Sequence, residues 1–427
     1  MKRLRTWLVV GVVLALVLTL TVWQLNLRDE PDVTAAVATT AASPALLERG
    51  AYLARAGNCM SCHTTRGGSP YAGGRGIATP FGTVFSSNLT PDTRSGIGSW
   101  SASHFWRAMH NGRSKDGRLL YPAFPYTSYT EVTREDSDAL YAYLQSLPAA
   151  AQPNTPHALR WPFNTQAALA AWRALYFNPG RYATDATQTA EWNRGAYLVR
   201  GLGHCSACHS ARNALGASST PLDLAGGLIP MQNWYAPSLT SPSEAGVADW
   251  QPEHIAALLK TGVSPRGSVL GPMAEVVLHS TQHMSDADLR AMAVFLKALP
   301  PTAVPSPTPV GAGDTPAARA GAKLYEQHCA QCHGEQGRGV PGAYPPLAGN
   351  RALTMASSAN LVQVVLNGGY APATAGNPRP FGMPPFVLVL NDNELASLLT
   401  YLRSAWGHQA SAVTPTEIHR IRGENQR

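Results

Sequence analysis

Charged side chains are scarce in this protein and make up only 14 % of its 427 residues. Glycine (38 residues) and proline (34 residues) are plentiful, which indicates a folded chain with long loops. The formal charge of +7 leaves out any cofactor, and the basic residues are scattered along the chain. Because no basic run is interleaved with aromatic residues, the composition argues against a nucleic-acid-binding protein. The length allows about two to four domains.

Cysteine is rare as well, and all six cysteines belong to three Cys-x-x-Cys-His motifs. A redox pair of the thioredoxin type need not be followed by histidine, and a structural zinc site would need a second pair of ligands beside each motif. Two thiols three residues apart can each bond to a vinyl group of one haem, and the next histidine then supplies the proximal nitrogen to the iron. The sequence therefore predicts three covalently bound haem c groups. The predicted attachment residues are Cys59, Cys62, Cys205, Cys208, Cys329 and Cys332, and the predicted proximal iron ligands are His63, His209 and His333.

A long apolar run follows the basic start MKRLR and extends from Trp7 to Trp23. Its length is close to the roughly 17–25 residues that cross a bilayer. A cleaved signal peptide would have a shorter apolar core with small residues directly after it, whereas QLN follows here. We therefore favour an uncleaved anchor over a cleaved signal sequence. The basic flank should stay in the cytoplasm, which places the rest of the chain outside it.

The sequence repeats around each haem motif. A segment with helical period and a glycine eight to ten residues before the first cysteine precedes each motif, and a capped amphipathic helix ends each unit. A middle helix that stops at a glycine lies between them. The glycines of the first helices are Gly50, Gly195 and Gly321, the caps of the last helices are Thr133, Ser285 and Asn391, and the middle helices end at Gly112, Gly262 and Gly368. The first glycine of each unit should let another helix approach closely.

These repeats predict an all-α fold with three tandem cytochrome c-type domains after an N-terminal transmembrane anchor. The expected parts are the anchor or signal sequence (1–30), a flexible tether (31–45), the three cytochrome c domains (46–150, 189–300 and 317–406), an aromatic segment between the first two (151–188), a Pro-rich linker (301–316) and a C-terminal tail (407–427). For the aromatic segment we favour packing between domains over a docking face for a partner subunit.

Electron-transfer haem usually takes a sixth ligand, and methionine in that position raises the reduction potential relative to histidine. Met273 and Met383 lie between the middle and last helices of the second and third units, where a c-type domain presents this ligand. We expect each of them to bind an iron. The corresponding stretch of the first unit, YPAFPYTSY, holds Phe124, and phenylalanine cannot bind iron.

The sixth ligand of the first haem therefore stays open. For Met109 we favour a core position over iron ligation. His104 and His110 are further candidates, although His104 has a counterpart in His254 that argues for a structural role. An open or water-bound position is the remaining alternative.

Longer segments resemble one family of proteins. They are TPFGTVFSSNLTPDTRSGIGSW and LYPAFPYTSYTEVTREDSDALYAYL in the first unit, NWYAPSLT and GPMAEVV in the second and FGMPPF in the third. The chain resembles, over nearly everything after the anchor, the trihaem cytochrome c subunits of bacterial membrane-associated dehydrogenases, such as those of alcohol and gluconate dehydrogenases. Many relatives have methionine where Phe124 stands, and this departure concerns only the sixth ligand of the first haem.

The resemblance implies an electron-transfer subunit without catalytic residues of its own. A dehydrogenase catalytic subunit of the flavin, quinone or molybdenum type would oxidise the substrate. This chain would pass the electrons along its haems to ubiquinone or a terminal oxidase, at the bacterial inner membrane with the haem domains on the periplasmic side. Two alternatives stay open: a haem peroxidase that uses the methionine-free first haem, although no distal acid–base group is evident, and a cytochrome that feeds an oxidase directly.

Overall fold

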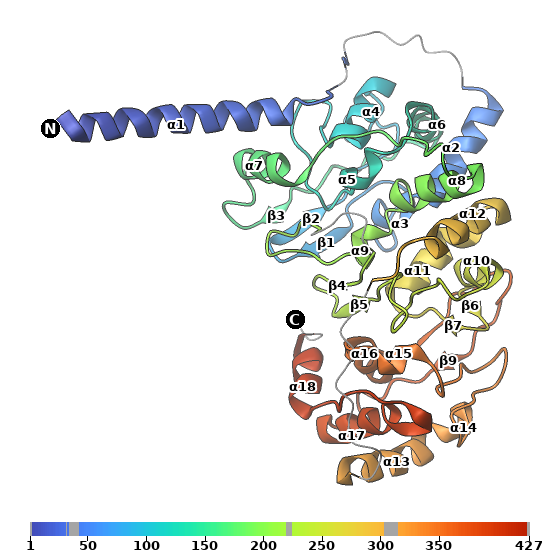
Figure 1. Ribbon diagram of the computed structural model, residues 1–427. Coiled ribbons are helices and arrows are strands. Elements are labelled where there is room, and N and C mark those ends of the chain that lie inside the picture. Colours follow the sequence, from blue (N-terminus) through green and yellow to red (C-terminus); the bar gives the residue numbers. More distant parts are fainter. Residues whose placement is uncertain (1, 31, 34–41, 219–223, 303–314, 425–427) are drawn as a thin grey trace. The chain divides into compact units, whose positions relative to one another are not determined.

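The computed structural model describes residues 2–30, 32–33, 42–218, 224–302 and 315–424. The chain divides into two compact units, Met1–Thr184 and Asp185–Arg427. Both units are mostly helical, as predicted (Figure 1).

The first unit contains a long N-terminal helix, a group of shorter helices and a small sheet. Its helices are α1 (Lys2–Asn26), α2 (Pro44–Ala56), α3 (Cys59–Cys62), α4 (Ala102–Asn111), α5 (Tyr126–Tyr129), α6 (Arg134–Gln145) and α7 (Gln166–Tyr176). Its strands are β1 (Gly76–Thr79), β2 (Gly82–Phe85) and β3 (Ala158–Leu159). Figure 1 shows α1 projecting from the rest of this unit, with α7 near its C-terminal end.

The second unit contains two successive groups of helices. The first group has α8 (Ala190–Arg200), α9 (Ser206–His209), α10 (Pro252–Thr261), α11 (Pro272–His279), the 3-10 turn Thr281–His283 and α12 (Asp286–Lys297), with strands β4 (Gly227–Ile229), β5 (Trp234–Ala236), β6 (Val263–Ser264) and β7 (Gly267–Ser268). The second group has α13 (Pro316–His328), α14 (Ala330–His333), α15 (Arg351–Thr354), α16 (Ala359–Asn367), α17 (Asp392–Leu402), the 3-10 turn Ala405–Gly407 and α18 (Pro415–Glu424), with strands β8 (Gly369–Tyr370) and β9 (Gly382–Met383).

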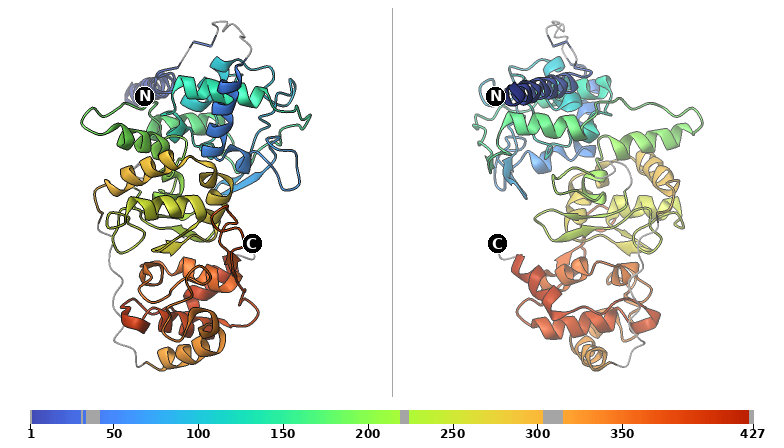
Figure 2. Two further views of the ribbon diagram at one scale, coloured as in Figure 1. Left: turned by 90° about the vertical axis from the view of Figure 1, so that its right-hand side faces the viewer. Right: turned by 60° about the vertical axis from the view of Figure 1, so that its left-hand side comes forward.

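Three helix pairs form the framework: α2 packs on α6, α8 on α12, and α13 on α17. Figures 1 and 2 show the orange α13 beside the red α17. At each crossing a glycine faces a main-chain oxygen of the other helix so closely that a Cβ atom would overlap it. The distances from the position of that Cβ to the oxygen are 2.0 Å for Gly50 and Ala139, 1.9 Å for Gly195 and Ala291, and 2.1 Å for Gly321 and Ser397. The predicted close approach at these glycines is confirmed.

The predicted helix ends are confirmed as well. Thr133 and Ser285 begin α6 and α12 as N-caps, and the side chain of each accepts a hydrogen bond from the third amide of its helix. Asn391 forms a full capping box with Glu394 at the start of α17. The middle helices α4, α10 and α16 all end at glycines with positive φ, which are Gly112, Gly262 and Gly368.

Short strands accompany these helices and were not predicted. The sheet β1-β2-β3 is antiparallel, with Ile77 paired to Val84 and Gly82 paired to Leu159. Gly82 (φ 124°) follows the tight turn between β1 and β2, and a Cβ there would lie 2.2 Å from the Ala158 oxygen. The other sheets have two strands each. The fold is thus mostly helical rather than purely α.

Two segments outside the three predicted cytochrome c domains pack onto the units. Within the aromatic segment, the Phe163 ring lies 4.4 Å from that of Phe81, and Phe177 lies 4.9 Å from Tyr126, both inside the first unit. Part of the predicted C-terminal tail forms α18, whose Ile418 and Ile421 are buried in the core beneath α16 and α17. This tail therefore contributes to the hydrophobic core of the second unit.

Candidate haem-binding sites

Each Cys-x-x-Cys-His motif forms a single helical turn. The main-chain N–H of the histidine donates to the carbonyl of the first cysteine at 3.0 Å in the first motif and at 2.9 Å in the other two. Residues three and four positions apart lie on one side of a helix. Both thiols and the imidazole of a motif therefore share one side of their turn, as attachment to a single haem requires. These turns lie in or beside α3, α9 and α14.

A main-chain carbonyl orients each of the three histidine rings. Nδ1 lies 2.7 Å from the Ser87 oxygen in His63, 2.7 Å from the Pro237 oxygen in His209, and 3.1 Å from the Pro345 oxygen in His333. Because a carbonyl only accepts, Nδ1 carries the proton and Nε2 keeps its lone pair. That tautomer is the one that binds a metal through Nε2.

Burial also favours the neutral form of these histidines. It lowers the pKa of His63, His209 and His333 below the ordinary value, against a smaller opposite effect of the carbonyl bonds. A neutral imidazole is the form that ligates iron. The three rings are thus prepared for ligation by both their surroundings and their hydrogen bonds.

A glycine holds the main chain of each histidine in the same way. The N–H groups of Gly73, Gly226 and Gly339 donate at 2.8 Å to the carbonyls of His63, His209 and His333, respectively. All three glycines have positive φ, at 76°, 89° and 62°. Their role could not be recognised in the sequence, because their distance from the motif varies. A glycine in the loop after each motif is the only signal that the sequence offers.

The first cysteine of each motif lies in surroundings that keep its thiol protonated. Burial, followed by the neighbouring cysteine of the motif, raises the pKa of Cys59 to about 12, of Cys205 to about 12 and of Cys329 to about 11. Reactive redox pairs and zinc-binding thiolates need the opposite shift. Within the described ranges no group of three or more His, Cys, Asp or Glu side chains could hold a metal ion. The residues fit covalent haem attachment better than either alternative.

The two predicted methionine ligands lie in short, partly buried elements. Met273 is the second residue of α11 rather than part of a loop, because Pro272 starts a helix there. Met383 forms β9, which pairs with Gly369 directly after α16. Both Met383 and the predicted attachment residue Cys329 pack against one hydrophobic core. In the second helical group of the second unit the structure therefore brings the predicted distal residue and the haem motif to the same core.

The other candidates of the first unit lie in or beside α4. Met109 is only 5 % exposed and lies among the buried residues of the core. The Nδ1 atom of His104 lies 2.8 Å from the hydroxyl of Ser101, and the two residues cap α4. Both ring nitrogens of the buried His110 have partners, the Thr130 carbonyl at 2.8 Å and Asp29 at 3.1 Å. Of these two histidines, His110 has both ring nitrogens engaged, and the Nδ1 atom of His104 is engaged at the cap.

Phe124 lies close to the first haem motif. Its ring is 5.3 Å from that of Tyr129, whose hydroxyl donates to the Gly57 carbonyl at 3.3 Å, two residues before Cys59. Burial raises the pKa of Tyr129 well above its usual range, with Cys59 and Cys62 adding to the shift. The loop that carries Phe124 thus belongs to the wall around these cysteines.

Comparison with known proteins identifies the family. The cytochrome c family model matches residues 47–148 and 318–406. The cytochrome c subunit of alcohol dehydrogenase (quinone) from Gluconacetobacter polyoxogenes is 38 % identical over 406 residues, which cover 91 % of this chain and 86 % of the relative. The chain belongs to the family of dehydrogenase cytochrome c subunits. Its role is therefore electron transfer, and catalysis in this family belongs to separate chains.

Two further relatives of this cytochrome subunit are similar over most of its length. The gluconate 2-dehydrogenase cytochrome c subunit of Pantoea cypripedii is 37 % identical, with 91 % of this chain and 92 % of the relative covered. The fructose dehydrogenase cytochrome subunit of Gluconobacter japonicus is 33 % identical, with 93 % and 86 % covered. Membership of the cytochrome c family implies covalently bound haem c.

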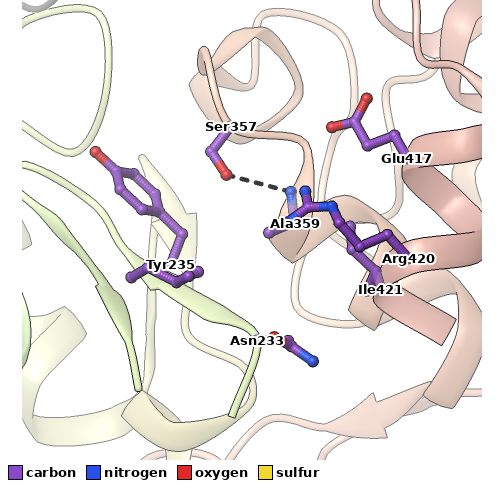
Figure 3. A pocket seen from close by; sticks show the side chains of 8 residues that line it. Asn233, Tyr235, Ser357, Ala359, Glu417, Arg420 and Ile421 are labelled. Carbon is purple, nitrogen blue, oxygen red and sulfur yellow. Dashed lines mark hydrogen bonds between the residues drawn. The ribbon is translucent and has the colours of Figure 1, made fainter. Parts of the chain in front are cut away.

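The cytochrome subunit also has a pocket of about 270 Å³ in its second unit. Figure 3 shows Tyr235 on one side of this pocket and Glu417, Arg420 and Ile421 of α18 on the other. Beside the pocket, the main-chain N–H of Ala359 donates to the Ser357 hydroxyl at 3.4 Å. None of the predicted haem ligands is among the described residues that line it. The pocket is therefore separate from the haem motifs.

Proposed function

We propose that this protein is a membrane-anchored trihaem cytochrome that relays electrons from a partner dehydrogenase to ubiquinone or a terminal oxidase. The three haems would lie in cytochrome c domains at residues 46–150, 189–300 and 317–406. The catalytic partner would carry a flavin, quinone or molybdenum cofactor. The names of the relatives, which include alcohol, gluconate and fructose dehydrogenases, support such a partner.

The observation that carries this proposal is the threefold repetition of one histidine arrangement. In each motif a carbonyl bonds Nδ1, a glycine N–H bonds the histidine carbonyl, and the histidine N–H bonds the first cysteine. A motif that had lost its haem would not need to keep the ring in this tautomer. The repetition therefore supports three haems rather than two.

The proposed ligands follow from the same arrangement. The six motif cysteines would hold the haems covalently, and the motif histidines would bind the irons through Nε2. Met273 and Met383 would be the distal ligands of the second and third haems. The first haem would lack a sulfur ligand, because Phe124 occupies its loop and Met109 lies in the core. Bound haem supplies the one-electron redox chemistry, while the protein sets its position and surroundings.

The proposed location is the bacterial inner membrane, with the haem domains on the periplasmic side. α1 is the one helix in the described ranges that is long and apolar enough to cross a membrane. Its 25 residues would span about 38 Å, more than the roughly 30 Å of a bilayer core. The basic residues at its start support a cytoplasmic N-terminus.

Counting the haems tests the proposal. We expect intact-mass measurement and the alkaline pyridine spectrum of the purified protein to give three covalent haems per chain. The variant Cys205→Ser/Cys208→Ser should retain two, and the matched variant Ser206→Ala should retain three. Two haems in the wild type would refute the trihaem assignment.

Co-purification tests the proposed partner. A dehydrogenase subunit should accompany the detergent-extracted protein, and its substrate should reduce the haems. If no such subunit ever associates, the relay is wrong. Rapid turnover of hydrogen peroxide by the isolated chain would instead favour the peroxidase alternative.

A further inference from the structure

One side chain joins the two helical groups of the second unit at strand β5. Asn360 is the second residue of α16, and its Oδ1 accepts from the main-chain N–H of Tyr235 at 2.8 Å. Its Nδ2 donates to the Tyr235 carbonyl, also at 2.8 Å. A carboxamide presents an acceptor and a donor side by side, so it can pair with a strand as another strand would. We refer to Asn360 and the main chain of Tyr235 as the amide clamp.

Further polar contacts join the same two groups. Beside the clamp, Gln363 Nε2 donates to the Asn233 carbonyl at 3.4 Å. Arg351 donates to the Gly246 carbonyl at 3.0 Å and to the Asp249 carboxylate at 2.7 Å. The second helical group is therefore bonded to the first through both α15 and α16.

Residues 372–376, in the loop after β8, lie against the end of α10. Thr374 Oγ1 donates to the Thr261 carbonyl at 3.2 Å. A Cβ atom on Gly376 would lie 3.3 Å from the Thr261 Cβ, and one on Gly262 would lie 2.4 Å from the Pro372 ring. The glycine that ends α10 thus also lets the other helical group approach closely.

The clamp is connected to Met273, the predicted distal ligand of the second haem. Trp234 precedes Tyr235 in β5, and a Cβ atom on Gly271 would lie 2.7 Å from its Cζ2 atom. The indole therefore packs directly on Gly271, which has a φ of 56° and is the N-cap of α11. Met273 is the second residue of that helix.

On its other side, the clamp is connected to Met383, the predicted distal ligand of the third haem. Helix α16 ends at Gly368, where a Cβ atom would lie 2.2 Å from the main-chain oxygen of Met383. The next residue, Gly369, pairs with Met383 between β8 and β9. A continuous series of contacts thus runs from one predicted distal residue through the clamp to the other.

We propose that Asn360 is a positioning residue for electron transfer between the second and third haems. The amide clamp fixes the two helical groups against each other and so fixes the separation of the haems that they carry. Electron transfer between two haems slows steeply as they move apart, so a relay needs a constant separation. The inference rests on the proposed trihaem relay for its haems, whereas the docking of the two helical groups does not.

A distance measurement between the two groups tests the clamp. In the full-length, haem-loaded chain, Ala287→Cys and Ala320→Cys provide labelling sites for gadolinium chelates at exposed positions of α12 and α13. Pulsed electron paramagnetic resonance should give one narrow distance distribution between the two labels. Asn360→Leu should lose this narrow peak, because both main-chain groups of Tyr235 lose their partner.

The matched control for this variant is Asn393→Leu. Asn393 is likewise the second residue of a helix, α17, and its side chain is exposed. Its replacement should leave the distribution narrow, and an equally narrow distribution in Asn360→Leu would overturn the proposal. If Asn360→Leu does not accumulate, Asn360→Asp, which keeps the acceptor and loses the donor, serves the same comparison.

A disulfide across the contact tests whether Asn360 acts through position. The Cβ separation of 3.3 Å between residues 261 and 376 is close to the roughly 3.5–4.5 Å of disulfides. Thr261→Cys/Gly376→Cys should therefore restore the narrow distribution to Asn360→Leu, whereas Thr261→Cys alone should not. A distribution that stays broad with the disulfide formed would overturn the positioning role.

A single nitroxide on Ala287→Cys extends the test to the haem. Its distance to the third iron should be narrow in the wild type and broad in Asn360→Leu, and Cys329→Ser/Cys332→Ser identifies this distance by removing that haem. An iron distance that stays narrow in Asn360→Leu would overturn the role of Asn360 toward the haems. The absence of any such distance would refute the third haem and the relay with it, while the gadolinium distances would still show whether the groups are clamped.

Discussion

Replacing Gly195 with alanine should destabilise the second unit, although alanine is the better helix former. The new Cβ would lie 1.9 Å from the Ala291 carbonyl oxygen and 2.8 Å from the Phe295 Cβ. Real Cβ atoms essentially never come closer than 3.0 Å to such neighbours, so α8 and α12 must separate by about an ångström. Overpacking of this kind costs about 1–3 kcal/mol, and the shift of two backbones places this case at the upper end. The higher helix propensity of alanine offsets about 1 kcal/mol of this loss in the free energy of unfolding.

The control for this variant is Gly423→Ala in α18, where a Cβ would meet nothing within 4 Å. Both glycines are helical and both lie in the second unit, so the propensity gain is shared and cancels in the comparison. Scanning calorimetry of the haem-loaded protein should show Gly195→Ala melting about 5–10 °C below Gly423→Ala. Equal melting temperatures, or a higher one for Gly195→Ala, would refute the idea that this crossing needs glycine.

Three other predictions concern single side chains. Burial lowers the pKa of His104 below 6.5, so the unfolded chain takes up a proton at a higher pH than the native one. The stability of the protein should therefore fall as the pH drops through 6.5. The melting temperature of His104→Gln, which still caps α4, should fall less between pH 7.5 and 5.5 than that of the wild type. Met109→Leu should cost less than about 1.5 kcal/mol and leave the sulfur-to-iron charge-transfer absorbance unchanged, and loss of part of that band would make Met109 a ligand. Arg403 is 1 % exposed and donates to the carbonyls of Leu353, Met355 and Ser411; Arg403→Lys should lower the free energy of unfolding by about 2–4 kcal/mol in urea titration, whereas an effect below about 1 kcal/mol would contradict this network.

Local sequence patterns predicted much of the framework. The structure confirms the caps Thr133, Ser285 and Asn391, which bond to amides within three residues in the chain. It also confirms the glycines at the helix crossings, where one type of helix contact is repeated three times. Helical period and capping are properties of short segments, so they can be recognised without knowledge of the tertiary fold.

Features that depend on distant segments could not be predicted in this way. The carbonyl of Ser87 that orients His63 lies 24 residues away, in a loop without a sequence pattern. The bond between Asn26 and Arg173 joins residues 147 positions apart. α18 lies in the stretch that the sequence predicted to be a C-terminal tail. Its burial depends on the core that α16 and α17 provide. Such contacts arise only once the helices are packed.

The carbonyl acceptors at Ser87, Pro237 and Pro345 have a consequence for how this protein can evolve. A carbonyl oxygen survives almost any substitution at its residue, so single mutations there leave the predicted proximal histidine oriented. The opposite side of a haem depends on a side chain, which one codon change can remove. Mutational drift should therefore alter reduction potentials from the distal side while haem attachment persists. Phe124 fits this asymmetry, because the first motif keeps its full set of proximal bonds beside a loop that carries no sulfur.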